Sequence, residues 1–410
     1  MNYISRSMEP VVAQAMGEYP VVLVTGARQV GKTTMLAHLV EREADAREYL
    51  TLDDLALRGL AKSDPALFFQ LHEPPVFIDE VQYAPELFSE MKRLADAGAP
   101  AGSFLLTGSQ QFRLMELAGE SLAGRVAVLS LPSLSQRELA GRAADAPLTL
   151  SLEALRARER GCEPVRAPEV FGRIHRGAMP AVASGQRSNA SLYYSSYVQT
   201  YIERDVRRLL GTVDALEFLS FLTAAAARCS QLLNVNSIAG DVGQRPEKIK
   251  AWLSVLERSG IVFYLHPYSN NQLKRTVKAP KLYFDDCGLV AHLARWTSAA
   301  ALESGAMSGA FVENFAVSEL RKSYLNAGID APLYYYRDRD GREIDLVMEA
   351  DGELHPVEVK KTASPNLAMT RSFSALDRAT TPRGAGAIVC FSERLGALDG
   401  RTYVVPMGLL

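Results

Sequence analysis

Short apolar runs alternate with amphipathic stretches along the first third of the chain. Aliphatic and aromatic residues gather at 21–24, 75–78 and 104–106, and between these runs apolar residues recur at helical spacing. Strands that alternate with helices are typical of a parallel sheet with helices on both faces. The pattern therefore predicts an α/β unit from Ile4 to about Ser133.

The pattern becomes less regular over residues 134–214, which we interpret as a helical lid and linker. Glycine and proline residues predict a loop from Arg173 to Ser188. A long helical pattern then covers 192–210 and ends in the charged segment Glu203–Arg208. This segment either meets a nucleotide or a partner through its arginines, or is the solvated end of an amphipathic helix.

Three helical patterns and one strand over residues 215–268 predict a winged helix-turn-helix module. The third helix of such modules commonly enters the major groove of DNA, and its candidate phosphate contacts here are Arg245, Lys248 and Lys250. Winged helices also dock proteins, and two acidic neighbours leave that alternative open. The expected elements are helices over 218–229, from Asn236 with Ser237 as a cap, and over 246–259, followed by a wing strand over 260–265.

The last part of the chain contains two strand-like runs that flank Asp351-Gly352, a strong hairpin signal. Because side chains alternate along a strand, Glu358 and Lys360 share one face. Asp345 on the neighbouring strand joins them, and Glu313 on an earlier helical run completes the set. We call these four residues the C-terminal cluster.

The C-terminal cluster has the pattern of the PD-(D/E)xK nuclease fold. Carboxylate oxygens are the ligands that Mg²⁺ prefers, and the ion stabilises charge at phosphorus and supplies hydroxide. Lys360 then orients the water or stabilises the transition state. The alternative is that this fold serves only as a binding platform.

One loop carries the most specific chemistry in the chain. An apolar run leads into it and a helical pattern leads out, and the residues between fit G-x-x-x-x-G-K-[ST], which predicts a phosphate-binding loop. Glycines let backbone N–H groups surround phosphate oxygens at a helix N-terminus. Lys32 then reaches the β- and γ-phosphates, and Thr33 holds Mg²⁺. The expected nucleotide contacts are Gly26, Ala27, Arg28, Gln29, Val30, Gly31, Lys32, Thr33 and Thr34.

Residues at later strand ends supply the expected chemistry of hydrolysis. Asp79 and Glu80 end a buried run, and ligand sites lie where parallel strands end. Asp79 is the second expected Mg²⁺ ligand, and Glu80 polarises the attacking water. Ser109 is the first candidate for contacting the γ-phosphate or the water, and Thr107 is the second. Arg125 is a candidate γ-phosphate sensor or finger, within this chain or across a subunit boundary, unless it is a surface arginine.

Taken in order, these motifs resemble those of a family of bacterial and archaeal AAA-type ATPases with a winged-helix segment and a C-terminal PD-(D/E)xK nuclease-like domain. The resemblance covers nearly the whole chain, and it implies that the nucleotide is ATP. The matching segments are TGARQVGKTT (25–34), LDD (52–54), FIDEVQ (77–82), LLTGS (105–109), LAGRV (122–126), YVQTYIERDVRRL (197–209), GAFVEN (309–314), and GREIDLV with VEVKK (341–347 and 357–361).

We therefore expect an α/β protein whose function is Mg²⁺-dependent ATP hydrolysis coupled to the binding or processing of DNA. One alternative is a nucleotide-dependent switch that binds a protein partner, with a non-catalytic C-terminal part. Another is a nuclease that ATP only regulates, and a homo-oligomer is compatible with each. The expected parts are an AAA-type P-loop ATPase domain (1–133), a helical lid and linker (134–214), a winged helix (215–268) and a nuclease-like domain (269–410).

Composition agrees with this expectation and bears on the cellular location that we expect for the protein. Of the 410 residues, 48% are hydrophobic and 22% are charged, as in ordinary globular proteins, and the net charge of −2 gives no overall basicity for nucleic acid. The four cysteines lack paired spacing, which speaks against a zinc site or a disulfide framework. No apolar run reaches the roughly 18 residues of a membrane helix, and no secretion signal is recognised. We expect a cytoplasmic protein without a membrane partner.

Overall fold

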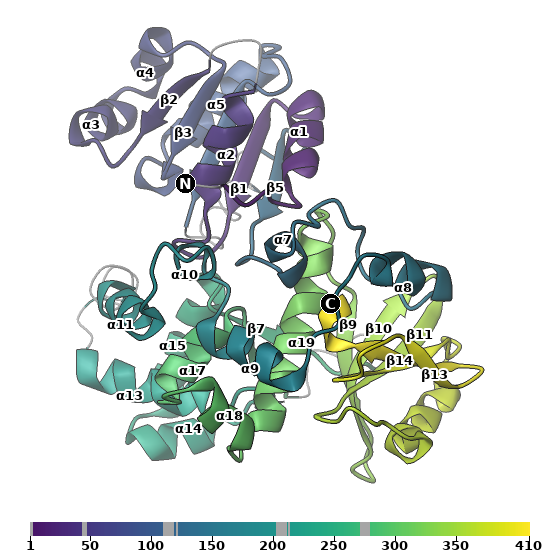
Figure 1. Cartoon of the computed structure of the whole chain (residues 1–410). Helices are drawn as coiled ribbons and strands as arrows, with labels where there is room; N and C mark the ends of the chain where they lie inside the picture. The colour runs from purple at the N-terminus through teal and green to yellow at the C-terminus, as the bar shows by residue number, and fades with distance from the viewer. Residues whose placement is uncertain are drawn as a thin grey trace.

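The computed structural model describes residues 3–42, 47–109, 119, 122–201, 211, 214–270 and 279–410. The charged segment Glu203–Arg208 lies outside these residues. Figure 1 shows an N-terminal α/β part, a mainly helical middle part beneath it and a C-terminal part built on a second large sheet. Of the helices in the described ranges, none combines the length and the apolarity needed to cross a bilayer.

The N-terminal part contains a parallel five-stranded sheet in the order β2-β3-β4-β1-β5, as the apolar runs predict. Along β1, Val22 and Val24 join one apolar cluster, whereas Val21 and Leu23 join another. Because the strand is buried on both faces, its sequence is an unbroken apolar run. The strands are β1 (Val21–Thr25), β2 (Glu48–Thr51), β3 (Val76–Asp79), β4 (Phe104–Gly108) and β5 (Val126–Ser130). The helices are α1 (Glu9–Glu18), α2 (Lys32–Val40), α3 (Leu55–Ser63), α4 (Pro65–Leu71), η1 (Val81–Tyr83) and α5 (Leu87–Asp96).

Short helices follow the first sheet. The expected loop from Arg173 to Ser188 is wrong in its first half, because α9 continues to Arg176 and α10 begins at Pro180. The apolar face of α9 is buried, and a proline in the first turn of a helix costs no hydrogen bond. The helices are α7 (Gln136–Leu139), α8 (Leu152–Glu159), α9 (Ala167–Arg176), α10 (Pro180–Ala183) and α11 (Ala190–Tyr201).

The middle part continues as helix, strand, two helices and two strands. Its three strands form an antiparallel sheet in the order β6-β8-β7. The expected cap Ser237 is wrong, because the Asn234 side chain caps this helix and accepts a 3.0 Å hydrogen bond from the Ser237 backbone. β8 lies beyond residue 268, so the sheet extends past the expected boundary. The elements are α13 (Ala215–Ala226), β6 (Gln231–Leu232), α14 (Val235–Val242), α15 (Pro246–Arg258), β7 (Val262–Leu265) and β8 (Lys281–Phe284).

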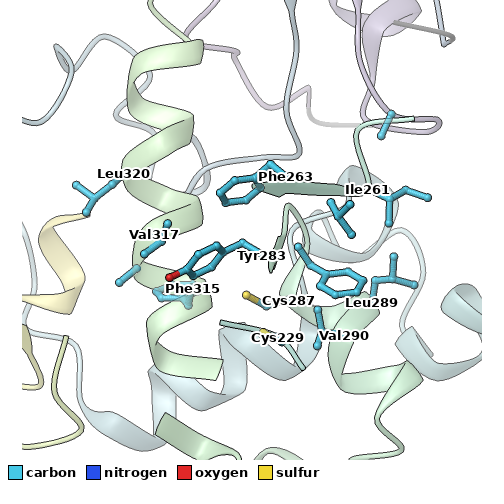
Figure 2. Packing of buried hydrophobic residues seen from close by; sticks show 14 of the residues in the cluster. Cys229, Ile261, Phe263, Tyr283, Cys287, Leu289, Val290, Phe315, Val317 and Leu320 are labelled. Atoms are coloured by element: carbon cyan, nitrogen blue, oxygen red, sulfur yellow. The ribbon is translucent and has the colours of Figure 1, made fainter. Parts of the chain in front are cut away.

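Strand β8 joins the middle part to the C-terminal part. In Figure 2, the side chain of Tyr283 lies beside Phe263 of β7 and is directed at the helix that carries Phe315 and Val317. That helix is α19 (Ser308–Leu325), which follows α17 (Cys287–Leu293) and α18 (Ala299–Ser304). The rings of Phe263 and Tyr283 stack with centroids 5.5 Å apart, and the buried Cys287 packs nearby. One apolar core therefore continues from the middle sheet to α19.

The C-terminal part contains a six-stranded mixed sheet in the order β13-β14-β12-β11-β10-β9. The predicted hairpin is confirmed: Asp351 (φ 53°) and Gly352 (φ 76°) form a two-residue turn between the paired residues Ala350 and Glu353. The strands are β9 (Leu333–Arg337), β10 (Glu343–Ala350), β11 (Glu353–Val359), β12 (Gly386–Cys390), β13 (Gly396–Asp399) and β14 (Thr402–Pro406), with 3₁₀ segments η3 (Leu367–Arg378) and η4 (Met407–Leu409).

Candidate functional site

The phosphate-binding loop connects β1 to the N-terminus of α2 and requires glycine at its first position. Gly26 has a φ of 143°, and a Cβ atom there would lie 2.2 Å from the carbonyl oxygen of Leu131. Gln29 and Gly31 also have positive φ, at 63° and 93°. The backbone thus turns sharply enough for its N–H groups to converge at the start of the helix.

The loop lysine is buried at the centre of this turn. The Lys32 Nζ atom donates hydrogen bonds to the carbonyl oxygens of Gly26 (3.0 Å) and Ala27 (2.9 Å). These contacts hold the ammonium beside the loop backbone, where a charge-assisted hydrogen bond to a phosphate can form. The structure therefore places Lys32 where the motif predicts it.

The two expected Mg²⁺ ligands are in contact. The Thr33 hydroxyl donates a 3.0 Å hydrogen bond to Oδ1 of Asp79, which the Thr107 hydroxyl also contacts. On the other carboxylate oxygen, the Tyr49 hydroxyl donates at 3.1 Å. Burial and the charge of Asp79 raise the pKa of Tyr49 to about 12. Tyr49 was not predicted, because no sequence motif indicates that β2 lies beside β3.

Glu80 follows β3 directly and is held by polar side chains. Its φ of 58° turns the chain out of the strand. The Ser109 hydroxyl donates to Oε2 of Glu80 at 3.4 Å, and the Gln82 amide contacts the same oxygen and Ser109 Oγ. Of the two candidates at the end of β4, Ser109 thus lies at Glu80 and Thr107 at Asp79. Gln82 is an additional contact that the sequence did not single out.

Arg125 does not reach this site within the same chain. It precedes β5, and its carbonyl oxygen accepts a hydrogen bond from the backbone of Val21, at the start of β1. The phosphate-binding loop begins at the other end of β1, roughly 13 Å away for four strand residues. The Arg125 guanidinium instead contacts Asp96 and the carbonyl oxygen of Ala123. An intramolecular role as γ-phosphate sensor is therefore excluded by strand direction.

A cavity of about 510 Å³ opens beside the loop. Arg28, Lys32 and Glu80 line one side, and Pro180 and Tyr197 of the short helices line the other. The sequence predicted the first side from the loop motif. For the second side the sequence predicted a helical lid but no individual contact, because α10 and α11 reach the loop only through the tertiary fold.

The buried Arg6, near the N-terminus of the chain, stabilises the phosphate-binding loop from a position outside the loop. Arg6 donates hydrogen bonds of 2.8 Å to the carbonyl oxygens of Val30 and Pro132, and its Nε lies 2.9 Å from Oε1 of Glu138. Both charged side chains are almost fully buried. Arg6 thus joins the loop, the exit from β5 and α7, although an isolated arginine gives no signal in the sequence.

Two adjacent tyrosines of α11 connect the loop to the middle part. The Tyr193 hydroxyl donates a 2.7 Å hydrogen bond to Oε1 of Gln29. The Tyr194 hydroxyl donates a 2.7 Å hydrogen bond to Oδ1 of Asp286, which caps α17 and also accepts from the Ala178 backbone at 2.6 Å. A single turn of α11 therefore contacts both parts.

The candidate DNA contacts of the middle part differ in their surroundings. Arg245 and Lys250 are exposed. Lys248 lies 2.5 Å from a carboxylate oxygen of Glu217 and above the ring of Trp252, at 4.9 Å from its centroid. Two of the three predicted cations are thus presented to solvent, and the third is engaged within the module.

Three members of the C-terminal cluster are in direct contact, as strand alternation predicts. Lys360 Nζ lies 3.3 Å from Oδ2 of Asp345 and also contacts Oε2 of Glu358. The backbone N–H of Val359 donates to Asp345 at 2.9 Å. Burial and the charge of Asp345 raise the pKa of Glu358 to about 8.

Glu313, the fourth member of the C-terminal cluster, is held by residues of β8. Its Oε1 accepts from the Tyr283 hydroxyl at 2.6 Å and lies 3.0 Å from Lys281 Nζ. Burial alone lowers the pKa of Lys281, but the charges of Glu313, Asp345 and Glu343 outweigh it, so the pKa is raised. Across the described residues, no three His, Cys, Asp or Glu side chains are grouped as metal ligands. Lys281 was not predicted, because β8 was not.

A family model agrees with the N-terminal assignment. Three family models match: an AAA domain over residues 18–140, and domains of unknown function over 168–300 (DUF8612) and 308–410 (DUF4143). Among solved structures, the Walker-type ATPase PABY2304 of Pyrococcus abyssi is similar with a TM-score of 0.43 and 14% identity, over 70% of this chain and 94% of that one.

Two mycobacterial relatives match most of the chain. The uncharacterized protein Rv2008c of Mycobacterium tuberculosis is 30% identical over 364 residues, which are 89% of this chain and 75% of that protein. The uncharacterized protein Mb2031c of Mycobacterium bovis matches to the same extent. The chain thus belongs to the family of these two proteins, and its N-terminal part is an AAA-type P-loop ATPase domain.

Proposed function

We propose that this protein is an Mg²⁺-dependent ATP hydrolase. The observation that carries the proposal is the pairing of Thr33 with Asp79, beside a phosphate-binding loop whose Lys32 is buried at the centre of the turn. The hydroxyl and the carboxylate are hard oxygen donors at adjacent positions, and they fit Mg²⁺. The ion neutralises charge on the phosphates when it is bound.

The remaining residues have distinct roles in hydrolysis. Lys32 leaves its carbonyl partners and binds the β- and γ-phosphates, and the backbone N–H groups of residues 26–34 surround the phosphate oxygens. Glu80 orients the attacking water and accepts its proton. The water oxygen bonds to the γ-phosphorus as the bond to the bridging oxygen breaks, which yields ADP and phosphate. Ser109, in contact with Glu80, positions that carboxylate and contacts the γ-phosphate.

ATP binding and ATP turnover, measured separately, test the proposal. Glu80→Gln keeps the shape of the side chain but cannot accept the proton, so we expect it to bind a fluorescent ATP analogue and to lose turnover. Lys32→Ala should lose both. Glu18→Gln, on the exposed face of α1, is the matched control and should match the wild type. Turnover that persists in Glu80→Gln would contradict the assignment of the base.

Arg125 contributes to catalysis only from a second copy of the chain. Strand direction places it at the far end of the sheet from its own loop. If a neighbouring copy presents it to the phosphates, turnover per chain rises with protein concentration in the wild type and stays low in Arg125→Ala. Turnover that does not depend on concentration, and that Arg125→Ala leaves unchanged, would assign Arg125 to a surface pair with Asp96.

A second candidate function is regulation of the ATPase by DNA through the middle part. The element order and the β6-β8-β7 sheet support a winged helix, and Arg245 and Lys250, at the start of α15 and within it, are exposed to solvent. We expect duplex, single-stranded or branched DNA to stimulate turnover in a salt-sensitive way. Lys250→Glu should weaken this response, and Lys62→Glu on α3 should not. A rate of ATP turnover that no DNA changes would favour the alternative of a protein partner.

For the C-terminal cluster we favour the role of a binding platform over that of a Mg²⁺-dependent nuclease. Glu313, Asp345, Glu358 and Lys360 are brought to one place, as a nuclease site requires. However, each of the three carboxylates already contacts a lysine of the protein. Cleavage of DNA in the presence of Mg²⁺, abolished by Lys360→Ala, would establish the nuclease instead.

A further inference from the structure

A lysine from the middle part lies inside the C-terminal cluster. Lys281 belongs to β8, which pairs with β6 and β7, and its side chain is 3% exposed. Its Nζ lies 3.0 Å from Oε1 of Glu313 and 2.6 Å from Oε1 of Glu343. A buried charge is retained only where opposite charges surround it, and these two carboxylates supply them.

The strand itself fixes the position of this ammonium. Lys281 pairs with Leu265 of β7 and with Leu232 of β6. Two residues further along the strand, Tyr283 points to the same side and donates to the same oxygen of Glu313. Figure 2 shows Tyr283 within the apolar packing, directed at α19. Lys281 therefore cannot withdraw to solvent as an exposed lysine on a loop can.

The other carboxylates of the site also have partners. Asp345 is held by Lys360 and by the Val359 backbone, and Glu358 by Lys360 and by the Ser372 hydroxyl at 2.7 Å. The second oxygen of Glu343 lies 3.7 Å from Arg337. Fixed cations of the protein thus balance the acidic side chains of the cluster.

A divalent ion on Glu313 conflicts with this arrangement. Mg²⁺ binds carboxylate oxygens at about 2.1 Å. An ion on Oε1 of Glu313 would therefore lie within about 5 Å of the buried Lys281 ammonium, where burial reduces the screening of their repulsion by water. The residues present do not fit the metal that the sequence pattern led us to expect.

We propose that the Lys281 ammonium is the resident cation of the C-terminal cluster, and that it excludes a divalent metal from it. The cluster is then a set of ion pairs that connects β8, α19 and the C-terminal sheet. Its chemistry differs from that of the phosphate-binding loop, where the hydroxyls of Thr33, Thr107 and Tyr49 contact Asp79.

Mn²⁺ binding tests the proposal without any assay of activity. The full chain is used without nucleotide and with Asp79→Asn, so that the site beside the phosphate-binding loop loses its carboxylate ligand. Bound Mn²⁺ is counted from the electron paramagnetic resonance signal of the free ion. We expect the same titration with and without a further Asp345→Asn. Adding Lys281→Met should create one Mn²⁺ site, which Asp345→Asn then removes, and Lys62→Met should create none.

Two results would overturn the proposal. The first is Mn²⁺ binding in the Asp79→Asn protein that disappears on adding Asp345→Asn, because the metal would then share the cluster with Lys281. The second is a folded Lys281→Met protein, judged by its circular dichroism and melting temperature, that gains no Mn²⁺ site. If Lys281→Met does not fold, the first comparison still tests the proposal, since it needs no change at Lys281.

Discussion

The hydroxyl of Tyr193 donates a 2.7 Å hydrogen bond to the side-chain oxygen of Gln29, and so links α11 to the phosphate-binding loop. Gln29 has a positive φ, which is unusual for a residue with a side chain. The contact therefore helps to hold a strained part of the loop in place.

Loss of this hydroxyl should weaken nucleotide binding. A net hydrogen bond contributes about 1 kcal/mol, so Tyr193→Phe should lower ATP affinity roughly fivefold, as measured by titration with a fluorescent analogue. Tyr194→Phe is the matched control on the neighbouring residue. It removes a bond to Asp286 instead, and should lower the melting temperature with a smaller effect on affinity. Equal effects of both variants on affinity would contradict this division.

Gly26 should tolerate no side chain. The Cβ atom of Gly26→Ala would lie 2.2 Å from a backbone oxygen, which cannot move as a flexible side chain can. We expect the loop to be displaced and ATP binding to be lost. Gly98→Ala is the control, since that glycine also has a positive φ (95°) but has open space around it. It should cost about 1 kcal/mol in stability and leave ATP affinity unchanged. Unchanged ATP affinity in Gly26→Ala would contradict the backbone conformation of the loop described above.

Arg6→Met should destabilise the N-terminal part strongly. It leaves the buried Glu138 without its ion pair and two carbonyl oxygens without a donor. Breaking a buried ion pair from one side costs about 3–5 kcal/mol, which urea unfolding would measure. Arg93→Met is the control. Its guanidinium pairs with Glu90 at the surface, where solvent screens the interaction, so we expect little change in stability. Similar losses for the two variants would argue against the buried contact.

The pair of Asp145 with Arg137 should make stability depend on pH. Burial by itself raises the pKa of Asp145, but the hydrogen bonds and charges of Arg137 and Arg142 outweigh it, so the pKa is lowered. A folded pKa below the unfolded value gives stability that is present above the unfolded value and is lost as the pH falls through the folded one. Because the Asp145 side chain is partly exposed and solvent screens the pair, Asp145→Asn should cost no more than about 1 kcal/mol at pH 7.

That difference should shrink as the pH falls below about 4, because the wild-type carboxylate becomes protonated. Urea unfolding of wild type and Asp145→Asn at several pH values measures it. Asp96→Asn, in an exposed pair with Arg125, should change stability little at any pH. A difference that stays constant down to pH 3 would show that the carboxylate charge does not contribute.

The local patterns predicted the N-terminal site well. The motif at residues 26–33 and the acids after β3 carry their own signals, because strand ends and glycine loops are set by neighbours in the sequence. Strand alternation likewise brought Glu358, Lys360 and Asp345 together. Arg125 lies away from the loop of its own chain for a local reason as well. It precedes β5, and a residue before a parallel strand lies at the opposite edge of the sheet from the ligand site.

The contacts that hold the sites in place had no local signal. Arg6 and Glu138 are 132 residues apart, Tyr193 and Gln29 are 164 apart, and Lys281 reaches Glu313 only because β8 pairs within the middle sheet. Periodicity describes which face of an element is buried but not which distant element covers it. The sequence by itself thus determined which residues offer phosphate and metal chemistry. The tertiary structure decided which partners hold or neutralise them, because charges at short range interact strongly only after folding has removed the water between them.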